Sequence, residues 1–340
     1  MIPSELLSMN DPALMNVCTD TCILRTGAWL LEGLCVELPT RHGAITMFSH
    51  DTGALASSLL CYGEWAENEI RLLNRLLPLG GTVIDVGAFI GTHSLAFAEA
   101  VGQSGSVFAF EAQAASFTLL VNNLKANNVT HVKPFWAAVG NAEGSDAGMI
   151  WQIDIGGSGN FGGTSVTAVS ELETSEARRV PWFRLDKLDL ARLDLIKIDA
   201  EGMEADVLAG AAALLLRHQP VVYAECNSID AGARVIKQLT EAGMHICAHV
   251  VRAFNPDNWY RNSKNIFGGA IEVALLGIPE RHKDHVAHAA NLLGERVLPI
   301  ETLDDLVFAM SVKPQYAHEV LNKTAACRSW LGAASSAAPC

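Results

Sequence analysis

The chain alternates short apolar runs with segments of helical spacing, a pattern that predicts a parallel α/β sheet. Continuous runs rich in β-branched residues are typical of strands buried on both faces of such a sheet. They lie at 83–86, 106–111, 131–139, 193–198 and 220–226. The intervening segments place apolar residues on one helical face, for example at 92–100, 117–125, 203–217 and 231–242. Further strands are expected at 245–250 and 270–276. We therefore expect helices covering both faces of one sheet.

Less regular regions flank and interrupt this alternation. The first 78 residues contain scattered Pro and Gly, short strands expected at 34–38 and 45–48, and helices expected at 54–60 and 64–77. Residues 140–180 are rich in Gly, Ser, Thr and acidic residues and predict an inserted β-hairpin with a glycine-rich loop at 156–163. The pattern thus predicts a lead-in over 1–78 that caps the ligand, a central domain over 79–279, and a helical extension over 280–340.

The turn after the first run has the form of a ligand-binding turn. The strand ends at Gly87, a second glycine follows at Gly91, and helical spacing begins at Thr92. Such a turn lets a ligand approach the backbone at a helix N-terminus. The spacing matches neither a dinucleotide G-x-G-x-x-G nor a Walker loop. Asp85 would repel a pyrophosphate and suits a cationic ligand, such as the amino group and sulfonium of S-adenosylmethionine.

Carboxylates follow the next strands at the same expected edge of the sheet. Glu111 ends the second strand about 26 residues after Asp85, where nucleotide-binding folds hold a ribose. Asp199 and Glu201 follow the fourth strand, and Glu225 ends the fifth. Carboxylates gathered in this way are costly to bury unless a cation, a metal or hydrogen-bond donors meet them.

Composition narrows the class of protein. The chain has 340 residues, half of them hydrophobic, and a formal net charge of −13 without any basic run, which argues against a nucleic-acid substrate. No signal peptide or membrane-spanning stretch is expected, so a cytoplasmic protein is the default. The eight cysteines form no C-x-x-C pair, so neither a disulfide framework nor a zinc site is expected.

Two stretches together resemble the FkbM family of S-adenosylmethionine-dependent methyltransferases. One is YGEW at 62–65 followed by VIDVGAFIG at 83–91, and the other is the more specific KIDAEGME at 197–204, followed by Pro220 and Glu225. The similarity covers roughly 54–279. Phe89 departs from the family pattern, which often has Asn at that position.

The resemblance implies a Rossmann-like seven-stranded sheet, mostly parallel with one antiparallel strand and with helices on both faces. It also implies S-adenosylmethionine as cofactor and a hydroxyl of a small molecule or glycan as methyl acceptor. Carried onto this chain, it assigns the cofactor site as follows: Asp85, Gly87, Ala88 and Gly91 around the methionine part, Glu111 on the ribose, Ala137 and Ala138 near the adenine, and Asp199 where the donor methyl meets the acceptor. The segment 62–65, just ahead of an expected helix, has two interpretations: a turn glycine with two core aromatics, or a segment that folds over the ligand and offers Tyr62 and Glu64 to it.

Methyl transfer from a sulfonium requires an aligned and deprotonated acceptor. The hypothesis is that Asp199, helped by Glu201 or Glu225, is the base, or that Asp199 and Glu201 hold Mg²⁺, which prefers oxygen ligands. Two other classes stay open: a non-catalytic binding or scaffold protein of the same fold, and an NAD(P)-dependent oxidoreductase, which the missing G-x-G spacing disfavours.

Overall fold

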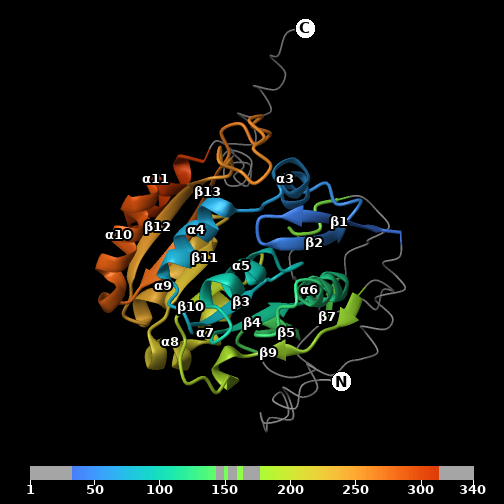
Figure 1. Cartoon of the computed structure of the whole chain (residues 1–340). Coiled ribbons are helices and arrows are strands. Elements are labelled where there is room, and N and C mark those ends of the chain that lie inside the picture. Colours follow the sequence, from blue (N-terminus) through green and yellow to red (C-terminus); the bar gives the residue numbers. More distant parts are fainter. Residues whose placement is uncertain (1–32, 143–148, 152–158, 164–176, 314–340) are drawn as a thin grey trace.

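A computed structural model describes residues 33–142, 149–151, 159–163 and 177–313, and its centre is an eight-stranded sheet (Figure 1). The strand order is β14-β12-β13-β11-β10-β3-β4-β5. In chain order these strands are β3 (Thr82–Val86), β4 (Ser106–Glu111), β5 (Val132–Trp136), β10 (Leu195–Ile198), β11 (Val221–Glu225), β12 (His245–Arg252), β13 (Ile271–Ile278) and β14 (Arg296–Pro299).

The sheet confirms the predicted α/β class but has one strand more than the seven implied by the resemblance. β13 runs antiparallel to β11 and β12, and β14 runs antiparallel to β12. Two strands therefore oppose the parallel core, where one was expected. The extra strand comes from the C-terminal extension, which was expected to be helical. It pairs with the outer side of β12 and so covers hydrogen-bonding groups that an edge strand would leave open.

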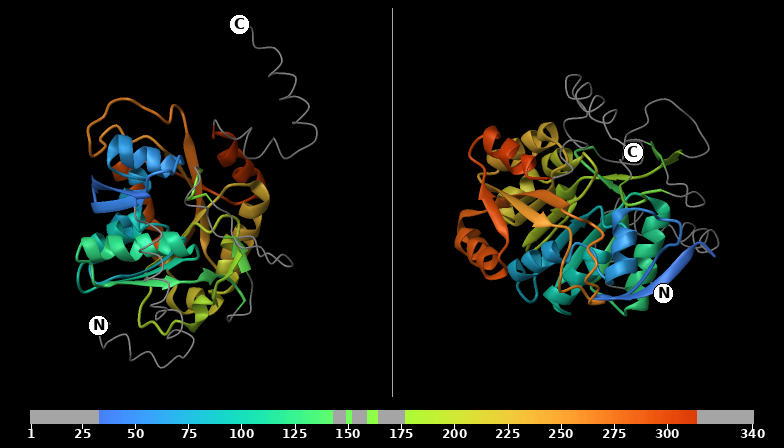
Figure 2. Two further views of the ribbon diagram at one scale, coloured as in Figure 1. Left: turned by 90° about the vertical axis from the view of Figure 1, so that its right-hand side faces the viewer. Right: turned by 90° about the horizontal axis from the view of Figure 1, so that it is seen from above.

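Helices pack on both faces of the sheet (Figure 2). They are α3 (Ala54–Tyr62), α4 (Glu67–Leu76), α5 (Thr92–Val101), α6 (Ala114–Ala126), α7 (Glu204–Ala209), α8 (Ala212–His218), α9 (Ile229–Glu241), α10 (Lys283–Leu293) and α11 (Leu303–Ser311), with short 3-10 turns at Leu185–Lys187 and Glu280–His282. The two core clusters divide them: α3, α4, α5, α6 and α10 share one face, and α7, α8, α9 and α11 the other.

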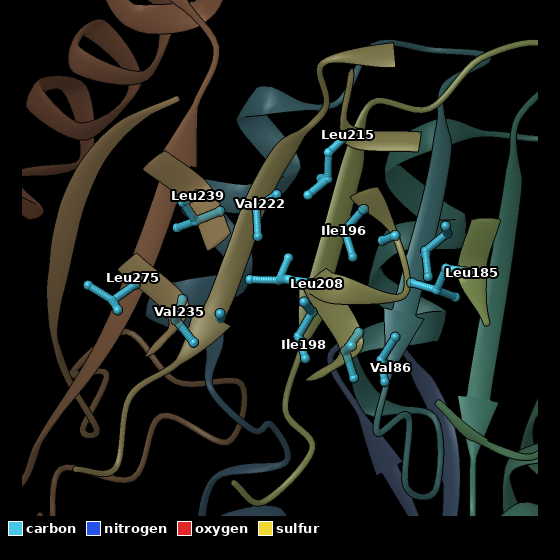
Figure 3. Packing of buried hydrophobic residues seen from close by; sticks show 14 of the residues in the cluster. Val86, Leu185, Ile196, Ile198, Leu208, Leu215, Val222, Val235, Leu239 and Leu275 are labelled. Atoms are coloured by element: carbon cyan, nitrogen blue, oxygen red, sulfur yellow. The ribbon is translucent and has the colours of Figure 1, made fainter. Parts of the chain in front are cut away.

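Side-chain alternation along the buried strands explains this division. In β10, Ile196 and Ile198 point into the core cluster shared by α7, α8, α9 and α11 (Figure 3). Leu195 packs on the other face, in the cluster shared by α3, α4, α5, α6 and α10. Successive residues of a strand face opposite sides of a sheet. Lys197 shares the face of Leu195 and is only 3% exposed, so this strand carries a cation into that side of the core.

Three short strand pairs lie outside the main sheet. They are β1 (Cys35–Thr40) with β2 (Gly43–Phe48), β6 (Ala138–Val139) with β9 (Trp182–Phe183), and β7 (Met149–Trp151) with β8 (Ala177–Arg179). The last pair is antiparallel and lies within the predicted insertion. Residues 143–148, 152–158 and 164–176 of the predicted insertion lie outside the described residues.

Two predicted elements are interrupted in the structure. The strand expected over 131–139 leaves the sheet after Trp136, and its last residues pair with β9 instead. The helix expected over 203–217 is divided into α7 and α8 at Gly210, where a Cβ would lie 2.3 Å from the carbonyl oxygen of Gly140. The backbone of Gly140 therefore occupies the space that a side chain at 210 would need, and the Gly210 carbonyl accepts the Asp186 N–H at 2.9 Å from outside the helix.

Among the described helices, none combines the length and the apolar character that crossing a bilayer requires.

Asn123 on α6 ties the β1–β2 hairpin to the domain. Its Oδ1 accepts the Thr46 N–H at 2.8 Å, and its Nδ2 donates to the carbonyls of Thr46 at 3.0 Å and Ile90 at 2.9 Å. We predict that Asn123→Ala lowers the free energy of unfolding by about 3 kcal/mol, because buried backbone groups lose their partners. Urea denaturation measures the loss. Asn122→Ala, on the exposed side of the same helix turn, is the control, and equal losses would contradict the prediction.

Candidate functional site

A cavity of about 530 Å³ crosses the carboxyl ends of the central strands. At the β4 and β5 end its wall includes Glu111, Gln113 and Ala138, and at the β11 and β13 end it includes Asn227 and Glu272. The sheet order places the turn after β3 and the segment after β10 between these two ends. The cavity thus passes the carboxyl ends of β3, β4, β10 and β11, the four strands after which the sequence predicts site residues.

The turn after β3 depends on the glycine at its start. Gly87 has φ +74°, and a Cβ there would lie 1.8 Å from the carbonyl oxygen of Asp199. The N–H groups of Gly87 and Ala88 both donate to the carbonyl of Phe110, at 3.0 and 2.9 Å. The turn is therefore pressed against the ends of both β10 and β4. Gly87 and Ala88 line the cavity, whereas Gly91 caps α5 and is not part of the wall.

Glu111 lies where the sequence predicts a ribose-binding carboxylate. Its Oε2 accepts the Phe89 N–H at 2.8 Å and its Oε1 accepts the Gln113 N–H at 2.6 Å. These two backbone donors fix the carboxyl plane at the cavity wall. Burial raises the pKa of Glu111 to about 7, although both N–H groups act in the opposite direction. The predicted residues Ala137 and Ala138 line the same end of the cavity.

Asp85 is not at the cavity wall, which corrects its predicted role as a ligand contact. It is fully buried, accepts a hydrogen bond from Ser94 Oγ at 2.6 Å, and lies 3.7 Å from Lys197 Nζ. Asp85 and Lys197 are register partners on the neighbouring strands β3 and β10. The carboxylate is one residue short of the strand end, so it meets the buried ammonium instead of the cavity.

The predicted catalytic carboxylates Asp199, Glu201 and Glu225 come together at the cavity. One oxygen of each lies within 4.8 Å of the others. Lys197 Nζ is 3.4 Å from Asp199 Oδ2, so one ammonium bridges Asp85 in the core and Asp199 at the wall. Burial alone would lower the pKa of Lys197, but Asp199 and Asp85 raise it above its usual range, so it stays charged.

The three carboxyls are driven to different protonation states. Burial would raise the pKa of Asp199, but Lys197 and a hydrogen bond from Glu225 bring it below its usual range. Burial and the charge of Asp199 raise the pKa of Glu225 well above its usual range. Burial, Asp199 and Glu204 raise the pKa of Glu201 to about 7. At neutral pH the site thus holds an ionised Asp199, a protonated Glu225 and a Glu201 poised between the two states.

A second polar group lines the cavity and was not found from the sequence. His93 Nε2 lies 2.9 Å from Glu69 Oε1, and both residues belong to the wall. The Tyr223 hydroxyl, also at the wall, lies 3.1 Å from Nδ1 of the fully buried His249. Lys197 had a detectable signal, because a lone cation within an apolar strand requires buried anions. Glu69 and His93 had none, since single polar residues are common on helices.

Tyr62 and Glu64 do not line the cavity, so the structure does not support direct contact with a ligand. Both side chains bind the segment 254–268, which joins β12 to β13. Glu64 accepts a hydrogen bond from the Trp259 N–H at 2.8 Å, and Tyr62 donates one to the carbonyl of Lys264 at 2.8 Å. Trp65, two residues after Gly63, is the member of this motif that reaches the wall.

The oxygen donors of Asp199, Glu201 and Glu225 have the chemistry that Mg²⁺ prefers, so they could hold that ion. The Lys197 ammonium already compensates Asp199, and the Asp199–Glu225 hydrogen bond already uses a proton between two of the three. A metal would have to displace that proton, and the Lys197 charge beside it would weaken its binding.

Comparison with known proteins gives a family match for part of the chain. Residues 85–246 match the sequence model of the methyltransferase FkbM domain. No curated protein matches the chain.

Solved structures of methyltransferases are similar to the chain at low identity. A precorrin-6y C5,15-methyltransferase from Geobacter metallireducens has 14% identity and a TM-score of 0.37, covering 62% of this chain and 86% of its own. A methyltransferase FkbM from Methylobacillus flagellatus has 15% identity and a TM-score of 0.36, covering 60% and 47%. An S-adenosylmethionine-dependent O-methyltransferase from Thermotoga maritima has 13% identity and a TM-score of 0.38, covering 72% and 85%.

The close contact between Gly87 and the Asp199 carbonyl can be tested by adding a side chain at position 87. We predict that Gly87→Ala lowers the free energy of unfolding by roughly 3 kcal/mol, the sum of a left-handed φ and a forced shift of the turn. Gly294→Ala is the matched control, because Gly294 is in the left-handed region with φ +69° and no atom lies within 4 Å of the added Cβ. Chemical denaturation should show a loss of only about 1 kcal/mol there. Equal losses in the two variants would show that the close contact with the Asp199 carbonyl does not add to the cost of a side chain at position 87.

Proposed function

Because residues 85–246 match the sequence model of the methyltransferase FkbM domain, we propose that the protein transfers a methyl group from S-adenosylmethionine to a hydroxyl of a small molecule or sugar. The observation that carries this proposal is the single cavity that joins Glu111 to the Asp199 cluster past the turn at Gly87. A ribose-bearing ligand held at Glu111 would extend along the strand ends toward the carboxylates, and a sulfonium is favourably placed beside them.

The cofactor would be held by the backbone as much as by side chains. The Glu111 carboxyl, fixed by two N–H groups, has further lone pairs for the two ribose hydroxyls. Ala137 and Ala138 offer a small apolar surface on which an adenine ring can lie. Gly87 and Ala88 leave room for the methionine part to approach the chain.

The reaction is an in-line displacement at the methyl carbon. The acceptor oxygen forms the new bond to carbon, the carbon–sulfur bond breaks with its electron pair going to sulfur, and the hydroxyl proton leaves to a base. In this proposal the ionised Asp199 orients the hydroxyl by accepting its hydrogen bond. Glu201, whose pKa is about 7, is the stronger base and takes the proton at neutral pH. Glu225 stays protonated and supports Asp199.

Cofactor binding should release a proton from Glu111. Its pKa of about 7 in the free protein means that it is mostly protonated at about pH 6, whereas ribose hydroxyls prefer the ionised carboxylate. We therefore expect the affinity to rise with pH and level off above about 7. Calorimetry at about pH 6, in buffers of different ionisation enthalpy, should show release of up to about one proton; the amino group of the cofactor stays protonated at this pH.

Glu111→Gln should abolish that release and weaken binding about tenfold or more, since a charged hydrogen-bond acceptor is lost. Glu201→Gln is the matched control and should keep the release. Release that persists in Glu111→Gln and disappears in Glu201→Gln would refute the assignment, because the proton would then come from Glu201 beside the sulfonium. Titration of the wild type with NADH in place of S-adenosylmethionine distinguishes the proposed enzyme from an oxidoreductase.

Asp199→Asn should slow methyl transfer about 10²-fold or more while S-adenosylmethionine binding changes only a few-fold, because orientation of the acceptor hydroxyl is lost. Tritiated methyl groups transferred to a fraction of cell extract provide the measurement, with the exposed Asp189→Asn as control. Wild-type rates should persist in EDTA. A loss restored by Mg²⁺ would favour the metal site instead, and near-normal activity of Asp199→Asn would exclude both versions.

A further inference from the structure

The segment 254–268, here called the acceptor loop, lies at the end of the cavity that the proposed cofactor leaves free. It connects β12 to β13, and β13 borders β11 in the sheet. Phe267 in the loop, with Ala253 and Ala270 at its two ends, lines the cavity. Adenine and ribose are assigned to the β4 and β5 end, and the methionine part to the turn after β3. What remains for the acceptor is this opposite end.

Glu64 holds the first half of the acceptor loop. Its Oε1 accepts the Asn255 side-chain amide at 2.7 Å, and its Oε2 accepts the Trp259 N–H at 2.8 Å. Arg41 pairs with Oε2 at 2.7 Å and donates to the carbonyl of Asp257 at 2.7 Å, so the ion pair also binds the loop. Glu64 is only 5% exposed, and charge-assisted hydrogen bonds of this kind are the strong ones.

Tyr62 holds the second half. Its hydroxyl donates to the carbonyl of Lys264 at 2.8 Å and accepts the Ile266 N–H at 2.7 Å. The ring lies 5.4 Å from that of Phe254 and 5.8 Å from that of Phe267. Phe267 contacts Tyr62 and also lines the cavity, so it connects Tyr62 directly to the cavity wall. A shift of the Tyr62 ring or hydroxyl would therefore move the wall.

Gly63 between these two residues lets the loop come close. Its φ is +66°, and a Cβ there would lie 2.6 Å from the Tyr260 ring and 2.9 Å from that of Trp259. The three residues Tyr62, Gly63 and Glu64 thus form one platform. The three residues are consecutive, so a single turn at the end of α3 contacts both halves of the acceptor loop.

We propose that Tyr62 and Glu64 are positioning residues for the methyl acceptor: they fix the acceptor loop so that Phe267 and its neighbours form the wall against which the acceptor binds. This inference rests on the proposed function for the identity of the bound molecule. It replaces the expectation that the two residues touch the cofactor, and it assigns the lead-in before the domain to the acceptor side of the reaction.

Glu64→Gln and Tyr62→Phe test the proposal, each removing hydrogen bonds to the loop while keeping the shape of the side chain. Hydrogen–deuterium exchange of peptides covering 254–268 should become about tenfold faster in both variants. The dissociation constant of S-adenosylmethionine should stay within about twofold. The apparent KM for the methyl-accepting extract fraction should rise about tenfold, with kcat changed only a few-fold.

Glu67→Gln is the matched control. Glu67 lies 3.7 Å from the same Arg41 and 2.9 Å from His42, and among the described residues no hydrogen bond or ion pair joins it to the loop. It should leave loop exchange and KM unchanged.

A faster loop without a change in KM would overturn the proposal, and so would a loss of cofactor affinity as large as the rise in KM. Unchanged loop exchange would also overturn it. If the wild type binds no S-adenosylmethionine or labels no fraction, the proposed function fails instead, while the exchange measurement still reports whether the two residues fix the loop.

Discussion

The ammonium of Lys197 is the interaction on which the site depends. It is buried between Asp85, one strand away in the core, and Asp199 at the cavity wall. A lone charge at this depth would be very unfavourable, but here each charge is compensated by the next. The chain of charges fixes β3 and β10 in register and keeps Asp199 ionised beside two carboxyls whose pKa values are raised. A buried ion pair inside the sheet therefore helps to set the protonation state of Asp199 at the cavity wall.

The backbone imposes a second constraint, because the turn after β3 and the end of β10 share one space. Gly87 meets the Asp199 carbonyl so closely that no side chain fits between them. The same contact brings the turn at Gly87 beside Asp199 of the acidic cluster, although the two residues are 112 positions apart in the chain (199 − 87). The contact between Gly87 and the Asp199 carbonyl thus packs β3 against β10 and also shapes the cavity. Gly87 is required both for its positive φ and for the lack of a side chain.

The segments outside the matched domain are also part of the architecture. The lead-in supplies Arg41, Tyr62 and Glu64, which bind the loop between β12 and β13. The extension adds β14 to the sheet edge, and Lys313 at its described end lies 3.1 Å from Glu272 of the cavity wall. Both segments reach the β11–β13 end of the cavity. The lead-in also supplies Ala54 and Leu55 to the cavity wall.

The sequence by itself determined the parallel strands, the turn at Gly87, and the strand-end positions of Glu111, Asp199 and Glu225. These features follow from local rules: apolar periodicity defines the strands, and the carboxyl ends of parallel strands lie at one edge of a sheet. Only the tertiary structure decided what depends on contacts between distant segments. It showed that Asp85 lies against Lys197 and away from the cavity wall, that Tyr62 and Glu64 hold a loop about 200 residues away, and that an eighth strand joins the edge. The physical reason is that a carboxylate accepts donors of any origin equally well, so its residue type predicts that it needs a partner but not which partner the fold brings to it.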